Sequence, residues 1–165
     1  MNDAEQRVVK KGDSIELEIE SLAFGGKGVA KVDGLAIFVE RTIPGQKVLA
    51  RIVKKKKSFA EAYPLEILKK APNEIEAKCP AFGTCGGCRL QNLEYDDQLL
   101  EKTRQVRDLV QRVGGFIDFE VPTALPSPTA FHYRNKMEFT FTPSPWRNHP
   151  DDVDEPLGLG QHIPG

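Results

Sequence analysis

The sequence predicts a β-rich α+β protein in which a small β-barrel precedes a cysteine loop, one α-helix and a β-hairpin. Three observations lead to this prediction. Apolar residues alternate with polar ones in short segments of the N-terminal part, and glycine-containing turns separate these segments. An apolar period close to that of an α-helix follows near residues 95–113. All three cysteines lie between these two parts, within ten residues.

The N-terminal part is predicted to form five short strands. Residues 12–20 alternate apolar side chains with acids, which is typical of a half-buried strand. The Asp33-Gly34 pair is typical of a tight hairpin turn. The other strands are expected after the glycine-rich bend at 24–30 and at 36–39, 47–53 and 59–67. Five such strands predict a small closed barrel of the OB type. We assign to its core Ile15, Leu17, Ile37, Val39, Val48 and Ile52.

Four consecutive lysines, Lys54, Lys55, Lys56 and Lys57, lie between the last two predicted strands and precede Phe59. They form either a solvated hairpin tip or a loop that contacts phosphate groups, with Phe59 available for stacking on a base. Lysine is a flexible point charge, so it suits contact with a nucleic-acid backbone better than readout of bases. The sequence leaves both interpretations open.

Cys79, Cys85 and Cys88 stand on a glycine-rich loop, with five residues between the first pair and two between the second. Thiolates gathered in this way hold an iron–sulfur cluster or a soft metal ion. Three ligands are one short of the usual four, and a cluster would normally add another cysteine. A zinc site could add a histidine instead. The chain offers His132, His149 and His162. Three unmetallated thiols are the third interpretation.

Residues 95–113 are predicted to form an α-helix. Apolar residues at positions 99, 106, 109, 110 and 113 share one helical face. Asp96 and Asp97 suit the first turn, and Gly114-Gly115 is expected to end the helix. The arginines of its later turns are expected on a solvated face, although they could also contact RNA.

Two segments near the C-terminus are predicted to pair as a β-hairpin, residues 133–142 and residues 157–162. The residues between them are rich in proline and acids and are expected to form a mobile loop. The first strand would carry Arg134 and Lys136 on the face opposite its apolar residues. We include both among the candidate contacts with nucleic acid.

The net charge of −1 is unevenly distributed. Residues 1–70 carry 14 Lys and Arg against 10 Asp and Glu, and residues 71–165 carry 9 against 14. The basic first part indicates a polyanionic partner. No apolar run approaches the roughly 20 residues that span a bilayer, and the N-terminus lacks the apolar core of a signal peptide. The clustered, odd number of cysteines argues against a secreted disulfide framework. We therefore expect a cytoplasmic monomer without membrane attachment.

Residues 9–67 resemble the TRAM domain, a small β-barrel found on RNA-modifying enzymes and taken to bind RNA. The resemblance rests on four short motifs and on Val48. The motifs are Gly12-Asp13, the run from Phe24 to Ala30, Phe38-Val39 and Ile43-Pro44-Gly45-Gln46.

The cysteine segment, Leu90-Gln91-Asn92, and residues 133–139 and 157–165 resemble bacterial RNA uracil-5-methyltransferases. The order of barrel, cysteine loop, helix and hairpin is also that of the family. The resemblance implies that the three cysteines are ligands of a 4Fe-4S cluster whose fourth ligand lies further along the chain. It further implies that the RNA is ribosomal or transfer RNA. In the family, S-adenosylmethionine, the catalytic nucleophile and the base belong to a downstream domain, which no residue here matches.

We therefore expect the N-terminal part of such an enzyme, inactive by itself. The expected domains are the RNA-binding barrel at 1–67, the iron–sulfur-binding loop at 68–94 and the start of the methyltransferase module at 95–165. Two alternatives remain. One is a free-standing RNA-binding protein with a structural zinc site, and the other is an inert truncation product.

Overall fold

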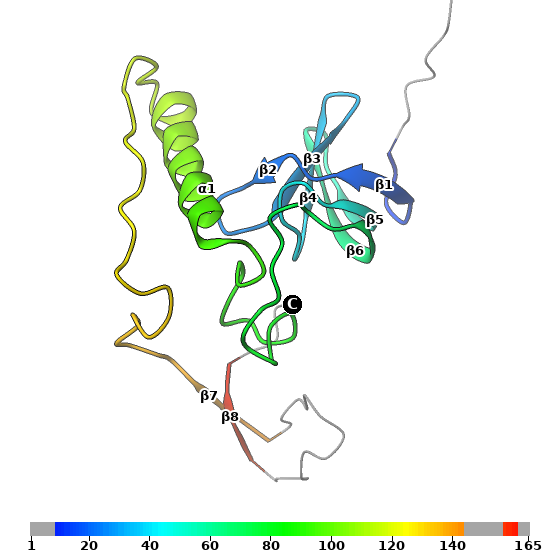
Figure 1. Cartoon of the computed structure of the whole chain (residues 1–165). Helices are drawn as coiled ribbons and strands as arrows, with labels where there is room; N and C mark the ends of the chain where they lie inside the picture. Colours follow the sequence, from blue (N-terminus) through cyan, green and yellow to red (C-terminus); the bar gives the residue numbers. More distant parts are fainter. Residues whose placement is uncertain (1–8, 144–156, 162–165) are drawn as a thin grey trace, which may run out of the picture.

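The computed structural model describes residues 9–143 and 157–161 (Figure 1). Its main sheet has six strands in the order β1-β5-β6-β4-β3-β2. β4 and β6 pair in parallel, and the other neighbouring strands pair antiparallel. The strands are β1 (Ser14–Glu18), β2 (Ser21–Leu22), β3 (Gly28–Val32), β4 (Leu35–Val39), β5 (Lys47–Lys55) and β6 (Phe59–Lys69).

The sheet closes into a barrel because β1 and β2 belong to one continuous segment that pairs with both of its edges. β1 pairs with β5, and β2 pairs with β3. Between them, the Ile19 amide donates to the Gln46 carbonyl at 2.9 Å and the Glu20 amide donates to the Val29 carbonyl at 2.8 Å. The prediction of one unbroken strand at 12–20 is therefore wrong in this detail, since the chain changes partner at Ile19.

The predicted barrel core is confirmed. All six apolar residues assigned to it from the sequence are at most 4% exposed and belong to one buried cluster. The hairpin turn between β3 and β4 is also confirmed, because Asp33 and Gly34 both have positive φ angles and Val32 pairs with Leu35. The fold is thus the β-rich α+β class expected from the sequence.

The predicted helix is confirmed as α1 (Tyr95–Asp108), which continues into a π-helical turn, η1 (Leu109–Val113). Its buried side chains are Leu99 and Thr103. The expectation of one apolar face along the whole helix is wrong for the described part of the chain. Val106, Leu109 and Val113 are exposed there, because residues 22–24 border this part of the helix across an open pocket and do not pack tightly on it.

The C-terminal hairpin is shorter than predicted. β7 (Thr140–Thr142) pairs with β8 (Gly158–Gly160), whereas residues 133–139 form no strand. Phe139 and Phe141 are exposed, so no described part of the chain packs on this part of the hairpin and stabilises a longer strand. Almost all of the predicted loop between the strands lies outside the described residues. No helix among the described residues is long and apolar enough to cross a membrane.

Candidate functional site

The cysteine loop is closed at its base by a short antiparallel contact. Glu74 forms a β-bridge with Leu93, the Ile75 amide donates to the Asn92 carbonyl at 2.9 Å, and the Glu94 amide donates to the Asn73 carbonyl at 3.2 Å. These bonds bring the two ends of the loop together before α1 begins. The three cysteines therefore project from a loop whose ends are fixed.

A second apolar cluster packs this base against the barrel. Leu93 is fully buried and lies with Leu22, Ile43 and Ala71. Residues 69–74, which the sequence indicates as a linker, are therefore partly built into the structure. The Glu74 carboxylate reinforces the contact by accepting a hydrogen bond at 2.8 Å from the side-chain amide of Gln46, a buried residue directly before β5.

Within the loop, a single tight turn positions the cysteines. The Phe82 amide donates to the Cys79 carbonyl at 3.0 Å, and the Cys85 amide donates to the Ala81 carbonyl at 2.9 Å. The Gly87 amide donates to the Cys85 sulfur at 3.3 Å. Amide donors of this kind are a feature of protein sites that bind iron–sulfur clusters.

The donors fit a thiolate-bound cluster in kind, because all three thiols are free and at least partly accessible. In the described residues, however, no three Cys, His, Asp or Glu side chains converge around one point that could hold a metal ion. His132 belongs to no such group, and His149 and His162 lie outside the described residues. The zinc alternative with a histidine ligand is thus left as a prediction.

The predicted lysine run forms the turn between β5 and β6, where the Lys56 amide donates to the Phe59 carbonyl at 2.8 Å. The Lys54 side chain contacts other parts of the barrel surface. Its ammonium group lies 2.7 Å from the Glu61 carboxylate and 5.9 Å from the centre of the Phe59 ring. Lys56 and Lys57 are exposed. The four lysines are therefore not equivalent candidates for phosphate contact.

Phe59 is a half-buried member of the barrel surface rather than a free stacking platform. Its ring packs edge-on against Phe38 of β4, with 5.8 Å between ring centres. Arg134 and Lys136 are exposed in the segment before β7, and Lys136 lies 2.8 Å from Glu138. Figure 1 shows this segment at the far end of the molecule from the β5–β6 turn. The structure thus does not bring these two residues to the lysine run.

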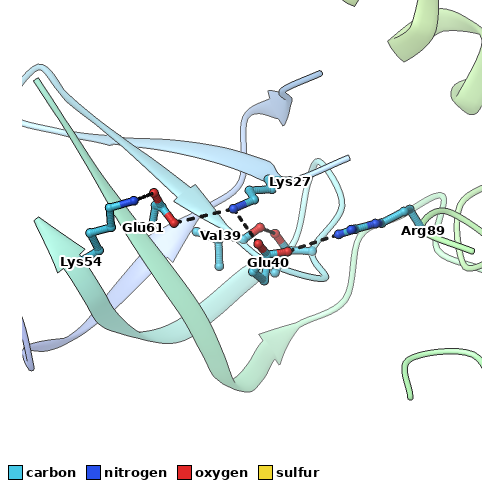
Figure 2. A network of polar contacts seen from close by, with 7 residues as sticks. Lys27, Val39, Glu40, Lys54, Glu61 and Arg89 are labelled. Atoms are coloured by element: carbon cyan, nitrogen blue, oxygen red, sulfur yellow. Dashed lines mark hydrogen bonds and ion pairs between the residues drawn. The ribbon is translucent and has the colours of Figure 1, made fainter. Parts of the chain in front are cut away.

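A network of ion pairs crosses the barrel surface and reaches the cysteine loop (Figure 2). Glu61 binds Lys54 and lies 3.7 Å from Lys27, Lys27 lies 2.6 Å from Glu40, and Glu40 lies 3.4 Å from Arg89. Arg89 directly follows Cys88 in the sequence. This ion-pair network therefore links the β5–β6 hairpin to the residue beside a predicted cluster ligand.

These ion pairs shift the pKa values of two residues, Lys27 and Glu61. The hydrogen bond with Glu40 raises the pKa of Lys27 above its usual 10.5. The hydrogen bond from Lys54 lowers the pKa of Glu61 below its usual 4.5. Both charges are thus favoured at neutral pH. Sequence reasoning missed Lys27, Glu40 and Arg89 as site residues, and the only signals were the glycines around Lys27 and the position of Arg89 after a cysteine.

The family model for the TRAM domain matches residues 8–65. A protein of Clostridium tetani named "Uncharacterized RNA methyltransferase" is 45% identical over 133 residues, which cover 81% of this chain and 29% of that protein. A protein with the same designation in Chlorobaculum tepidum is 37% identical over 164 residues, which cover 94% of this chain and 34% of that protein.

Two solved structures also match part of this chain. The tRNA (uracil-54, C5)-methyltransferase of Pyrococcus abyssi is 26% identical, with a TM-score of 0.47 over 76% of this chain and 26% of that chain. A conserved protein of Methanococcus maripaludis is 27% identical, with a TM-score of 0.34 over 40% of this chain and all of that chain. This chain spans about 29% of the length of the first curated relatives it matches. Residues 8–65 thus form a TRAM domain, and about 80% of the chain is similar to part of proteins named RNA methyltransferases.

Proposed function

We propose that this chain is the RNA-binding and iron–sulfur-binding part of an S-adenosylmethionine-dependent RNA uracil-5-methyltransferase. The observation that carries the proposal is the TRAM match at residues 8–65, together with the similarity of 81% of the chain to a protein named RNA methyltransferase. The choice of uracil C5 follows from the resemblance of the cysteine segment and of residues 133–139 to that class. The substrate is ribosomal or transfer RNA, and the protein acts as a cytoplasmic monomer.

The barrel binds the RNA backbone in this proposal. Lys56 and Lys57 are exposed at the β5–β6 turn. Their ammonium groups can therefore reach phosphates, whereas Lys54 would first have to leave Glu61. Lys54 contributes indirectly, because it neutralises Glu61 on the same surface. Contacts of this kind release counterions and carry no sequence information, so they give affinity that falls with salt.

The cysteine loop holds the cluster in this proposal. Cys79, Cys85 and Cys88 are the ligands within this chain, and the Gly87 amide supports the Cys85 sulfur. A bound cluster would cross-link the loop and add its binding free energy to the stability of the fold. Because the loop base packs on the barrel through Leu93, the cluster would also stiffen the side of the barrel that faces it. No step of methyl transfer is assigned to residues of this chain.

Metal analysis after anaerobic reconstitution with iron and sulfide tests this proposal against its alternative. Iron together with acid-labile sulfide, lost in a Cys85→Ser variant and kept in a Ser58→Ala variant, is the expected result. Stoichiometric zinc in place of iron would overturn the cluster assignment and support a TRAM protein with a structural zinc. Uptake of neither metal, in a chain with native circular dichroism, would also contradict it.

A further inference from the structure

A second cluster of cations and an aromatic ring lies on the outer face of the barrel. Arg51 of β5 is the register partner of Tyr63 of β6. Side chains of register partners project from the same face of a sheet. The Tyr63 ring is 42% exposed, and the Arg41 guanidinium lies 5.6 Å from its centre. Arg41 thus lies beside an accessible ring, and Arg51 projects from the same face of the sheet.

These arginines differ in their partners from the cations of the ion-pair network. Lys27, Lys54 and Arg89 all bind carboxylates. Among the residues that the structure describes, no carboxylate forms an ion pair with Arg41 or Arg51. Their charges are therefore available for an external anion.

The backbone at Arg41 is held in an unfavourable conformation. Its φ is +54°, in the left-handed region that costs about 1–3 kcal/mol for a residue other than glycine. The next residue fixes the turn, because the buried Thr42 hydroxyl donates to the Val39 carbonyl at 3.1 Å. The turn sends Glu40 to Lys27 and Arg89, while the Arg41 guanidinium lies 5.6 Å from the centre of the Tyr63 ring and leaves Tyr63 42% exposed. Strain of this kind clusters at binding sites.

We propose that Arg41, Arg51 and Tyr63 form a subsite for single-stranded RNA, in which a base stacks on Tyr63 and the two guanidinium groups hold the adjacent phosphates. The inference rests on the proposed RNA-binding function and adds the strand type and the contact residues. An exposed ring with arginines beside it suits an unpaired base, because stacking on a side chain requires a base face that a duplex does not offer. Arginine also matches phosphate oxygens in a bidentate manner.

The subsite continues the charged surface described above. Tyr63 stands two residues from Glu61 on β6, which is about 7 Å along a strand. Lys27 and Lys54 neutralise Glu61, so it presents little repulsion to a passing phosphate. Glu40, which binds Arg89 of the cysteine loop, directly precedes Arg41 in the sequence. This subsite therefore adjoins the side of the barrel that carries the cysteine loop.

The test is a fluorescence-anisotropy titration of the chain with a labelled 12-nucleotide oligouridine and with a duplex of equal length. Tyr63→Ala is expected to weaken binding to the single strand about 5- to 150-fold, the range for one lost base–aromatic stack. Tyr63→Phe keeps the ring and should bind like the original chain. Leu65→Ala, at another exposed position of β6, is the matched control and should have no effect.

The salt dependence separates stacking from charge. Tyr63→Ala should leave the slope of log affinity against log salt unchanged, whereas Arg51→Ala should reduce it by about 0.7. Equal affinities of Tyr63→Ala and Leu65→Ala for oligouridine would overturn the inference and leave the proposed RNA binding intact. The same loss on the duplex as on the single strand would overturn the assignment to single strands. Failure of the original chain to bind any RNA at low salt would instead overturn the proposed function itself.

Discussion

The packing of the cysteine loop on the barrel makes a strong prediction about Leu93. This residue is fully buried in the cluster that joins the loop base to Leu22 and Ile43, and it is outside the core cluster of the barrel. Leu93→Ala would remove buried methyl groups and leave a cavity, which costs about 2–5 kcal/mol at such sites. Even the lower figure raises the undocked fraction about 30-fold. The loop should therefore detach while the barrel stays folded.

Native-state hydrogen exchange read by mass spectrometry measures this effect. The Ile75 and Glu94 amides, which close the loop base, should exchange at least ten times faster in the variant, while peptides from β3 to β6 keep their protection. Leu100→Ala is the matched control, because Leu100 is exposed on α1 and should cost within about 0.5 kcal/mol. Equal exchange in the two variants, or equal acceleration in barrel and loop, would refute the reasoning.

Three further predictions follow from the described contacts. Lys56→Ala with Lys57→Ala should reduce the slope of log affinity against log salt by about 1.4, which is about 0.7 for each lysine. Lys54→Ala should reduce it by clearly less than about 0.7, and a reduction of about 0.7 would show that the Lys54–Glu61 pair opens on binding. Glu61→Gln should destabilise the fold by up to about 1 kcal/mol at pH 7. Because the pKa of Glu61 is lowered by folding, that difference should vanish as the pH falls below 4.5, and a pH-independent difference in thermal unfolding would contradict the ion-pair assignment. Limited proteolysis should leave a stable barrel fragment ending near residues 67–75, and earlier cleavage inside β3 or β4 would show that the barrel depends on the rest of the chain.

The barrel could be predicted from the sequence because its information is local. Alternating apolar residues, the Asp33-Gly34 turn and the glycine-rich bends each specify a strand or turn without reference to distant parts. The change of partner at Ile19 could not be predicted in this way. The apolar alternation through residues 15–19 is the same whether the segment faces one edge of the sheet or two.

The sites were harder to predict because they depend on contacts between distant segments. The lysine run is visible in the sequence, but the pairing of Lys54 with Glu61 requires the register of β5 on β6. Arg41 and Tyr63 meet only because β4 lies beside β6 in parallel. Residues 133–139 show the opposite failure, since a strand-like pattern there lacks a described layer to pack against.

The central claim is that this chain binds RNA through the basic outer surface of its TRAM barrel. The most direct measurement is the affinity of the chain for unrelated single-stranded RNAs as a function of salt concentration. At least three phosphate contacts, from Lys56, Lys57 and Arg51, predict similar affinities across sequences and a slope of about −2 in log affinity against log salt. No detectable binding at low salt, or an affinity that does not change with salt, would contradict the account.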